Sequence, residues 1–367
     1  MFLLARKNLL VHKGRFLLAI TGISSAVILV LLLMGLYDGW REHMSAYLNH
    51  VNTDVWIGQK GSYDLFQTLS LLPAEGEDLL READGVKKVS PFVGRLMTVE
   101  VKGQKRHSFI VGVADVDSGP VEMVDGSAAL HNGEIVIDEV FARKECLAIG
   151  DSLIVRDKPL RIIGIARGGN CFLYQYAFVT LSQAKQLFSM DGLVNYFLVQ
   201  LAPHVQIEEA VIRIEETSPL VSAFPKAQFT ANNLSLTGDN FLPILRVLEV
   251  IGLLVGVVVI GLTVSTLTAE RSAEYGVFKA IGAPNRILYW TAMQQALICG
   301  LCGWLIGVPA SWGVIEMAQY FVPQFPAVTY SHHALWMLGG TIVMSLLAAV
   351  FPIRRIARID PVVAFKG

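Results

Sequence analysis

Four long runs without charge dominate the pattern of hydrophobic and polar positions along this chain. The windows that contain no Asp, Glu, Lys, Arg or His cover residues 16–37, 250–269, 287–312 and 334–353. A helix that spans a bilayer needs roughly 20 apolar residues, and each window supplies that length. The pattern predicts a polytopic α-helical membrane protein with transmembrane helices at 16–38, 246–269, 287–312 and 334–353.

The first apolar run has the features of an anchor rather than of a cleaved signal peptide. It is longer than the roughly 7–15 apolar residues of a signal peptide, and the sequence GLYDGWREHM that follows offers no A-x-A-like cleavage site. We therefore expect this helix to stay in the membrane.

The distribution of lysine and arginine orients the predicted helices. Basic residues gather in 1–15, 270–286 and 354–367, whereas the segment 313–333 has none. Short loops rich in Lys and Arg stay in the cytoplasm. We therefore expect the cytoplasmic (inner) membrane, both termini and 270–286 inside, and a short outer loop at 313–333. Residues 1–15 alternate apolar and basic clusters, as in an amphipathic helix on the inner membrane face or in a plain basic flank.

The segment 39–245 predicts a large extracytoplasmic α+β domain inserted between the first two transmembrane helices. Runs rich in β-branched and aromatic residues, typical of strands, occur at 54–57, 96–101, 108–113, 134–137, 152–155, 161–166, 176–179 and 196–200. Helix-like pieces occur at 75–83, 138–147, 181–188 and 206–216. Thr180 or Ser182 can cap the third of these helices. Both flanks of the domain have helical patterning that continues into the membrane helices, so we expect a paired stalk.

Composition adds few further constraints. Hydrophobic residues make up 53% of the 367 residues and charged residues only 17%, where soluble proteins average about 25%. A net charge of −1 gives no basic footprint for nucleic acid. Cys146 and Cys171 fall in the outer domain, where an oxidising compartment permits a disulfide, but we expect two unpaired buried thiols rather than a bridge.

Catalytic chemistry is not indicated by any motif. The chain has no G-x-x-x-x-G-K-[ST] phosphate loop, no H-E-x-x-H zinc pair and no G-x-S-x-G nucleophile turn. The four charge-free windows by definition also lack the ionisable residues that mark ion-coupled pathways. We therefore expect no catalytic, cofactor-binding or metal-binding residues, and energy for transport must come from elsewhere. His332 and His333 are adjacent and point in different directions on a helix, so a shared metal ion needs further ligands.

Small residues recur at four-residue spacing in two of the predicted spans. Gly252 and Gly256 form one strip, and Cys299, Gly303 and Gly307 form the other. Small residues let helix backbones approach closely in membranes. We expect helix packing at both strips and a homodimer seam at one of them. The C-x-x-C at 299–302 lacks the cationic surroundings that activate a thiol.

The sequence ERSAEYGVFKAIGAPNRILYW at 270–290 places charges between two apolar runs. Glu270 and Glu274 lie one helical turn apart, and Tyr275, Phe278 and Ile281 form an apolar edge. We expect Gly282 to stop this helix and Pro284 to begin the next. A re-entry turn explains the basic residues but not the carboxylates, which contribute little to topology. The aromatic edge favours docking into a groove on another protein.

The pattern E-R-x-x-E-Y-x-x-x-K-A-I-G-A at 270–283 resembles the coupling helix of the MacB/FtsX-type ABC transporter permeases. The ending RRIARIDP at 354–361 and the outer-domain stretches at 54–61 and 133–155 are also similar to that family, over essentially the whole chain. The nearest resemblance is to the permeases of heterocyst-glycolipid-type exporters.

The resemblance implies a permease that is not itself an enzyme and that transmits motion from a separate cytoplasmic ATPase, which carries the ATP and Mg. The residues that it places against the ATPase are Glu270, Arg271, Glu274, Tyr275, Phe278 and Lys279. It also implies a homodimer, a periplasmic adaptor of the membrane-fusion type, and export or extraction of a lipid, glycolipid, lipoprotein or amphiphilic drug. An FtsX-like signalling protein that regulates an envelope hydrolase is the alternative, and a receptor without an ATPase is a third.

Overall fold

The computed structural model describes residues 13–171, 174–270, 272–282 and 284–357. Nearly all of the predicted N-terminal amphipathic helix and most of the tail at 354–367 lie outside these ranges. The chain divides into two compact units, each described by itself. The helical unit contains the residues up to Asp38, Leu242–Phe321 and the residues from Ala327 on; the sheet unit contains Gly39–Phe241 and Val322–Pro326.

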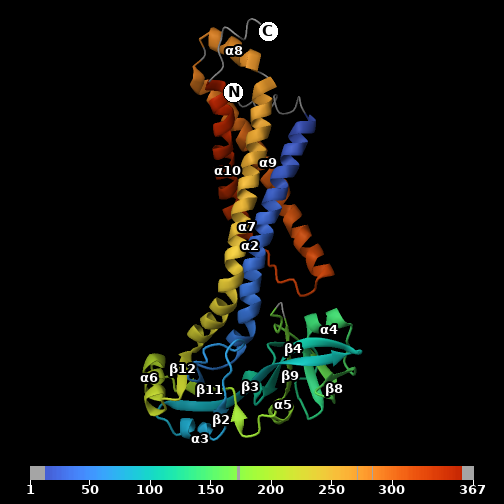
Figure 1. Cartoon of the computed structure of the whole chain (residues 1–367), viewed down its shortest axis with the longest axis vertical. Coiled ribbons are helices and arrows are strands. Elements are labelled where there is room, and N and C mark those ends of the chain that lie inside the picture. Colours follow the sequence, from blue (N-terminus) through green and yellow to red (C-terminus); the bar gives the residue numbers. More distant parts are fainter. Residues whose placement is uncertain (1–12, 172–173, 271, 283, 358–367) are drawn as a thin grey trace. The chain divides into compact units, whose positions relative to one another are not determined.

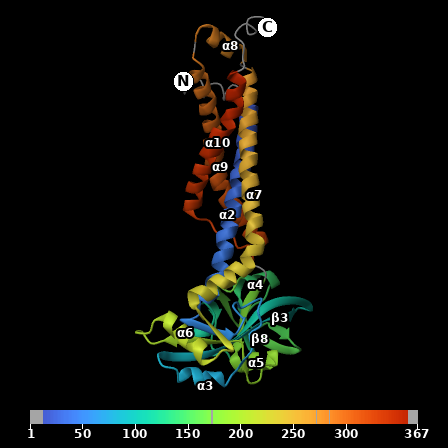
Figure 2. The same cartoon turned by 60° about the vertical axis from the view of Figure 1, so that its left-hand side comes forward.

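Four long apolar helices make up most of the helical unit, where they lie side by side (Figures 1 and 2). They are α2 (Lys13–His50), α7 (Lys226–Glu270), α9 (Asn285–Phe321) and α10 (Ser331–Ala357), and the short α8 (Ser272–Ala280) connects α7 to α9. Within the described residues, each of the four contains a segment long and apolar enough to cross a membrane. One expected boundary is corrected: α9 continues through the first part of the predicted outer loop, because 313–321 keeps helical geometry to Phe321.

Glycines in α9 allow this helix to approach α2 closely. A Cβ at Gly303 would lie 2.4 Å from Cγ2 of Ile23, and one at Gly307 would lie 2.8 Å from Cβ of Val27. The close approach also lets the Ser24 hydroxyl donate a hydrogen bond to the Gly303 carbonyl oxygen, at 3.0 Å. Cys299, the third member of the strip, is fully buried in the same core.

The second small-residue strip packs on other helices of the same chain. A Cβ at Gly252 would meet Val30 of α2 at 3.0 Å, and one at Gly256 would meet the Met344 sulfur of α10 at 2.6 Å. Both strips are thus filled by side chains of this chain. The predicted homodimer seam does not fit this geometry, because a second copy has no access to those glycine faces.

Besides the adjoining parts of α2 and α7, the sheet unit contains twelve described strands, four α-helices and one short 3-10 turn at Val116–Ser118. The strands are β1 (Val55–Gln59), β2 (Leu72–Pro73), β3 (Val86–Val101), β4 (Gln104–Val113), β5 (Glu122–Gly126), β6 (Glu134–Asp138), β7 (Ser152–Val155), β8 (Lys158–Arg167), β9 (Gln175–Thr180), β10 (Leu193–Val194), β11 (Tyr196–Leu201) and β12 (Val221–Pro225). The α-helices are α3 (Gly76–Arg81), α4 (Glu139–Glu145), α5 (Leu181–Phe188) and α6 (Ile207–Thr217).

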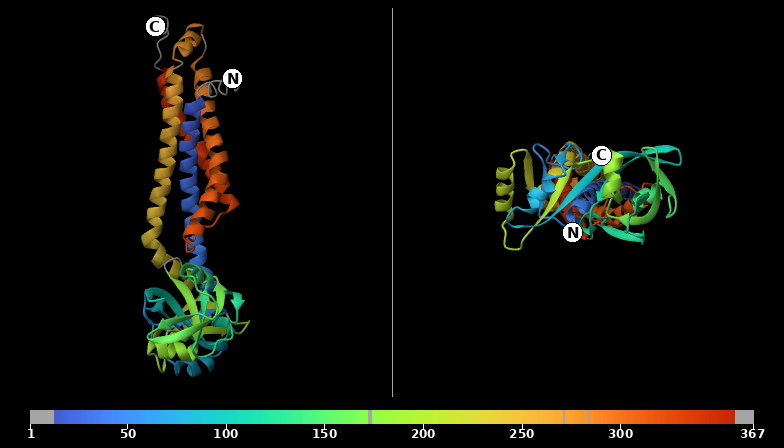
Figure 3. Two further views of the ribbon diagram at one scale, coloured as in Figure 1. Left: turned by 90° about the vertical axis from the view of Figure 1, so that its right-hand side faces the viewer. Right: turned by 90° about the horizontal axis from the view of Figure 1, so that it is seen from below.

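Among the described residues, ten of the strands form one mixed sheet in the order β12-β1-β11-β3-β4-β9-β6-β8-β5, with β7 bridging β3 and β8. The long β3 is shared by two halves, since it pairs with β11 through its first part and with β4 through its second. Seen from below, α6 lies at one end of the domain and the region of β4 and β8 at the other (Figure 3). The remaining strands, β2 and β10, form a separate pair.

Local sequence signals identified many of these elements. The helix expected at 181–188 is α5, and the Thr180 hydroxyl caps it by accepting a hydrogen bond from the Gln183 amide. Cys146 and Cys171 are free thiols. Cys171 is buried, which raises the pKa of its thiol, but Cys146 is exposed, so the expectation of two buried thiols holds for one of them.

We predict opposite outcomes for two alanine substitutions in α9. Gly303→Ala should destabilise the helical unit by about 1–3 kcal/mol, because the added carbon overlaps Ile23. Gly313→Ala should be neutral or stabilising by up to about 1 kcal/mol, because nothing lies within 4 Å of its Cβ position and alanine is the better helix former. Unfolding of the purified protein in a denaturing-detergent titration measures both. Equal effects of the two substitutions would contradict the packing described here.

Candidate functional site

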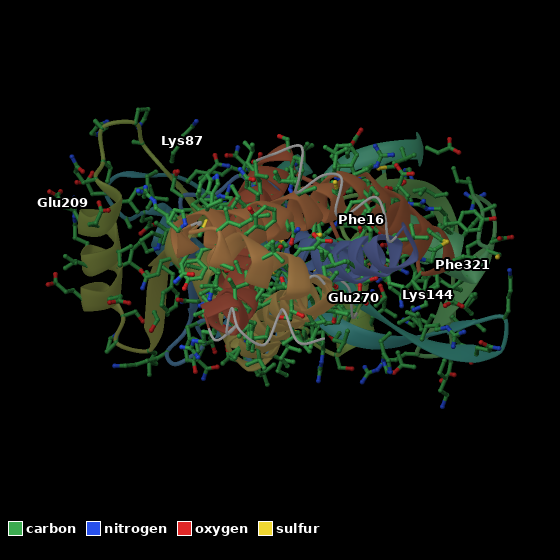
Figure 4. All side chains as sticks on the ribbon, turned by 90° about the horizontal axis from the view of Figure 1, so that it is seen from above. Phe16, Lys87, Lys144, Glu209, Glu270 and Phe321 are labelled. Carbon is green, nitrogen blue, oxygen red and sulfur yellow. The ribbon has the colours of Figure 1, made fainter. Side chains whose placement is uncertain are left out.

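Helix α8 and its flanks contain the residues expected to meet an ATPase. Glu270 is the last residue of α7 (Figure 4), and Glu274 lies in the first turn of α8. Gly282, with a φ of +92°, ends the turn that follows α8, and α9 begins one residue after Pro284. Arg271 is outside the described residues.

The predicted apolar edge of α8 is divided between two faces. Tyr275 is only 5% exposed and belongs to the core of the helical unit, so its assignment to a docking surface is corrected. Phe278 is 42% exposed and Ile281 is 78% exposed. At about 100° per residue, position 275 points about 60° away from position 278 and about 100° away from position 274, which turns Tyr275 toward the core.

Lys279 also faces the helical unit. Its ammonium group donates to the carbonyl oxygens of Ile356, at 2.7 Å, and Ala357, at 3.3 Å, in the last turn of α10. A cation near the C-terminal carbonyl groups of a helix is favourable. Lys279 thus holds α8 to α10, while its contact with an ATPase stays a prediction.

The side of α8 that remains exposed combines a carboxylate with apolar groups. We call it the exposed α8 face, and it consists of Glu274, Val277 and Phe278 of α8 together with Ile281 in the turn that follows. Positions three and four residues apart lie on one side of a helix. The arrangement is a small amphipathic docking surface on a helix that is fixed by its other side.

The sheet unit holds the ends of α2 and α7 by aromatic contacts. Tyr47, near the end of α2, is fully buried, and its hydroxyl donates to the Ser118 carbonyl oxygen at 2.9 Å. Its ring centroid lies 4.5 Å from that of Tyr176 in β9. In the first part of α7, the Phe229 ring stacks on Trp56 of β1 at 4.6 Å with an interplanar angle of 12°.

Lys226 joins the two helix ends to each other. Its ammonium group, at the start of α7, donates to the carbonyl oxygens of Asn49 and Val51, both at 2.7 Å. The first lies in the last turn of α2 and the second just beyond it. Burial lowers the pKa of Lys226, and the nearby Asp54 carboxylate opposes that effect.

A large apolar pocket lies on the half of the sheet unit that contains α3 and α6. Its volume is about 950 Å³, and its walls include Ile57, Leu80, Phe197 and Ile214. The charged groups that line it are Glu75, Glu82, Asp84, Arg213 and Glu216. Arg213 is paired with Asp84, at 3.9 Å, and with Glu209 of α6. The pocket therefore combines apolar walls with an acidic rim, a feature that no sequence motif indicated.

Replacing Lys226 should loosen the ends of both helices. Lys226→Met keeps the aliphatic stem but removes the donor of two backbone carbonyls, one exposed and one partly buried, which should cost about 0.5–1.5 kcal/mol of stability. Hydrogen exchange in the last turn of α2 and the first turn of α7 should accelerate. Lys87→Met is the control, because this side chain projects outward from the domain (Figure 4). Unchanged exchange in Lys226→Met would show that the ammonium group does not join the helices.

Family models match most of the chain. The model of the MacB-like periplasmic core domain matches residues 16–217, which is more than half of the chain. The model of the FtsX-like permease C-terminal domain matches residues 246–361. Together with the four apolar helices, these matches confirm the predicted architecture of a membrane protein with an α+β domain between its first and second membrane helices.

Relatives of the chain are named as permeases. An uncharacterized ABC transporter permease of Mycobacterium bovis is 25% identical over 366 residues, which cover 97% of each chain. The macrolide export ATP-binding/permease protein MacB of Escherichia coli is 22% identical over 393 residues, which cover 99% of this chain and 60% of that protein. The periplasmic region of MacB from Actinobacillus actinomycetemcomitans matches 50% of this chain and 92% of its own, with a TM-score of 0.38 and 12% identity.

The family resemblance noted in the coupling-helix pattern, the tail and the outer domain is thus confirmed, whereas the nearer likeness to heterocyst-glycolipid-type exporters stays a prediction. A match over more than half of the chain to the periplasmic core, with the permease domain following it, establishes that this protein belongs to the MacB/FtsX-type family of ABC transporter permeases.

Proposed function

We propose that this permease passes ATP-driven motion from a separate cytoplasmic ATPase to its periplasmic core domain. The observation that carries the proposal is the way in which α2 and α7 end. Each is a continuous helix by its bounds, and each has its final or first turns buried among aromatic side chains of the sheet unit. When either helix is displaced along its axis, its buried rings are displaced with it. A close-packed interior does not let the rings slide past their neighbours, so the sheet unit moves with the helix.

On the cytoplasmic side, the ATPase contacts the exposed α8 face. Its carboxylate and apolar side chains suit a groove with an apolar floor and a basic rim. Tyr275 and Lys279 fix α8 to the helical unit from the other side. A push on α8 is therefore passed to the bundle instead of being absorbed by a hinge. This assignment includes the proposed topology, with both termini and α8 in the cytoplasm and the protein in the inner membrane.

The cargo is an amphiphile, such as a lipid, glycolipid, lipoprotein or amphiphilic drug. The apolar pocket of about 950 Å³ supports this class, because it is large enough for a drug-sized or acyl group. Its rim carries four carboxylates and one arginine that is already paired. Neutral or cationic amphiphiles fit such a rim better than anionic ones. The macrolide export named for the Escherichia coli relative belongs to the same broad class.

A homodimer with two ATPase subunits and a periplasmic adaptor completes the proposed assembly. Since both small-residue strips are filled within the chain, the dimer contact belongs to other surfaces of the membrane helices. The alternative function is transmembrane signalling, in which the periplasmic core domain controls an envelope hydrolase and moves no cargo. It uses the same coupling, so the partner on the outer side distinguishes the two.

The test is co-purification of the tagged permease from its own membranes. Glu274→Arg and Phe278→Ser should each reduce recovery of a P-loop ATPase at least about tenfold, which corresponds to 1.4 kcal/mol of binding free energy. Both change the exposed α8 face without touching the buried side of the helix. Glu209→Arg is the matched control, because Glu209 is an exposed carboxylate on α6 of the sheet unit (Figure 4).

Each outcome selects one function. An adaptor in the eluate with the ATPase supports export, and a hydrolase supports signalling. If the wild type recovers no ATPase under gentle solubilisation, the proposed energy source is wrong and the receptor interpretation replaces it.

A further inference from the structure

A cluster of polar side chains lies where α2 meets the start of α10 in the helical unit. Asp38 is the last residue of α2 that belongs to this unit, and His332 and His333 are in the first turn of α10. Nε2 of His333 lies 2.8 Å from Oδ2 of Asp38. One potential metal-binding atom of each residue lies within 4.8 Å of the other two.

The rings of the two histidines converge although the residues are adjacent. Their centroids are 4.4 Å apart, with an interplanar angle of 69°. The Tyr330 ring contacts both, stacking on His332 at 5.2 Å and meeting His333 edge-on at 5.5 Å. Both imidazoles thus bring a nitrogen within 4.8 Å of an Asp38 oxygen, a placement that ideal helix geometry alone does not give.

The cluster opens into a small pocket. Its volume is about 310 Å³, and α7 contributes Arg246 and Glu249 to its wall, while α10 also contributes Trp336. His333 is buried, Asp38 is partly buried, and His332 is exposed. The pocket gives a bound ion room for a water molecule or for the Glu249 carboxylate as a further ligand.

A hydrogen bond between a buried histidine and an aspartate explains part of this arrangement. It accounts for Asp38 and His333, because a buried imidazole needs a polar partner. It does not account for His332, which is exposed and gains nothing from burial, yet brings a third ligand atom to the same point. Two imidazole nitrogens and one carboxylate oxygen are a common ligand set for zinc and other late first-row divalent ions.

We propose that Asp38, His332 and His333 bind a divalent transition-metal ion, with Zn²⁺ as the reference ion. Zinc takes N and O ligands at about 2.0–2.2 Å, which places tetrahedral ligand atoms about 3.3 Å apart. Binding requires side-chain rotations from the present separations, which are at most 4.8 Å. The fourth position faces the pocket.

The three ligands come from two different helices. A bound ion therefore holds the end of α2 that leads to the sheet unit against the start of α10. This site is independent of the proposed coupling to an ATPase, since it involves no residue of α8 and none of the anchoring rings. The helical unit would thus bind a divalent metal ion as a ligand.

The test measures zinc binding by the full-length permease, purified through a tag that contains no histidine and stripped with a chelator. Zn²⁺ is then titrated in competition with a chromophoric chelator. We expect one ion per chain for the wild type, and at least about tenfold weaker binding for Asp38→Asn and for His332→Gln. His131→Gln is the matched control, because His131 is an exposed histidine beside Glu134 in the sheet unit.

A second measurement separates loss of a ligand from loss of the fold. His332 is exposed, so His332→Gln should leave the metal-free unfolding temperature unchanged, whereas added Zn²⁺ should raise that temperature in the wild type only. Co²⁺ bound to the wild type should show the intense visible bands of a four- or five-coordinate ion. The proposal is overturned if the wild type binds no stoichiometric zinc, if both variants bind it as tightly as the wild type, or if Co²⁺ shows only weak six-coordinate bands.

Discussion

The burial of aromatic rings at the ends of α2 and α7 is the contact on which the rest of this permease depends. Tyr47, Trp56 and Phe229 are fully buried, and each ring is held by at least one other ring or by a hydrogen bond. Aromatic pairs contribute about 0.5–1.5 kcal/mol beyond the area that they bury. Their shapes also admit few alternative positions, so helix ends and sheet move together.

Tertiary contacts of buried side chains also hold the short helix α8, which follows the other end of α7. Helix α8 has only nine residues, too few to be stable in isolation. Tyr275 and Lys279 supply the tertiary contacts that hold it, one by apolar burial and one by hydrogen bonds to the end of α10. Because those contacts use one side of the helix, the opposite side can present Glu274 and Phe278 without loss of stability.

Close backbone approach holds the membrane helices of the helical unit together. Apolar side chains gain little by leaving lipid for one another, so packing and interhelical hydrogen bonds decide the arrangement. Gly303 provides both, since it admits Ile23 against the α9 backbone and leaves its carbonyl open to Ser24. The Asp38–His333 contact adds a polar tie between α2 and α10 in the same unit.

The sequence by itself determined the elements that depend on local pattern. Charge-free runs of sufficient length identified the membrane helices, and runs rich in β-branched and aromatic residues identified eight of the strands at least in part. Thr180 was one of the two residues expected to cap α5. It missed short strands such as β2 and β10, whose two residues carry no periodicity. It also recognised the family from the 270–283 motif.

Only the tertiary structure decided which side of each helix faces its neighbours. Tyr275 packs in the core of the helical unit, Lys279 donates to the α10 carbonyls, and both glycine strips contact side chains of the same chain. Asp38 and His333 are 295 positions apart, and no local pattern can signal that they meet, because their contact is set by helix packing alone.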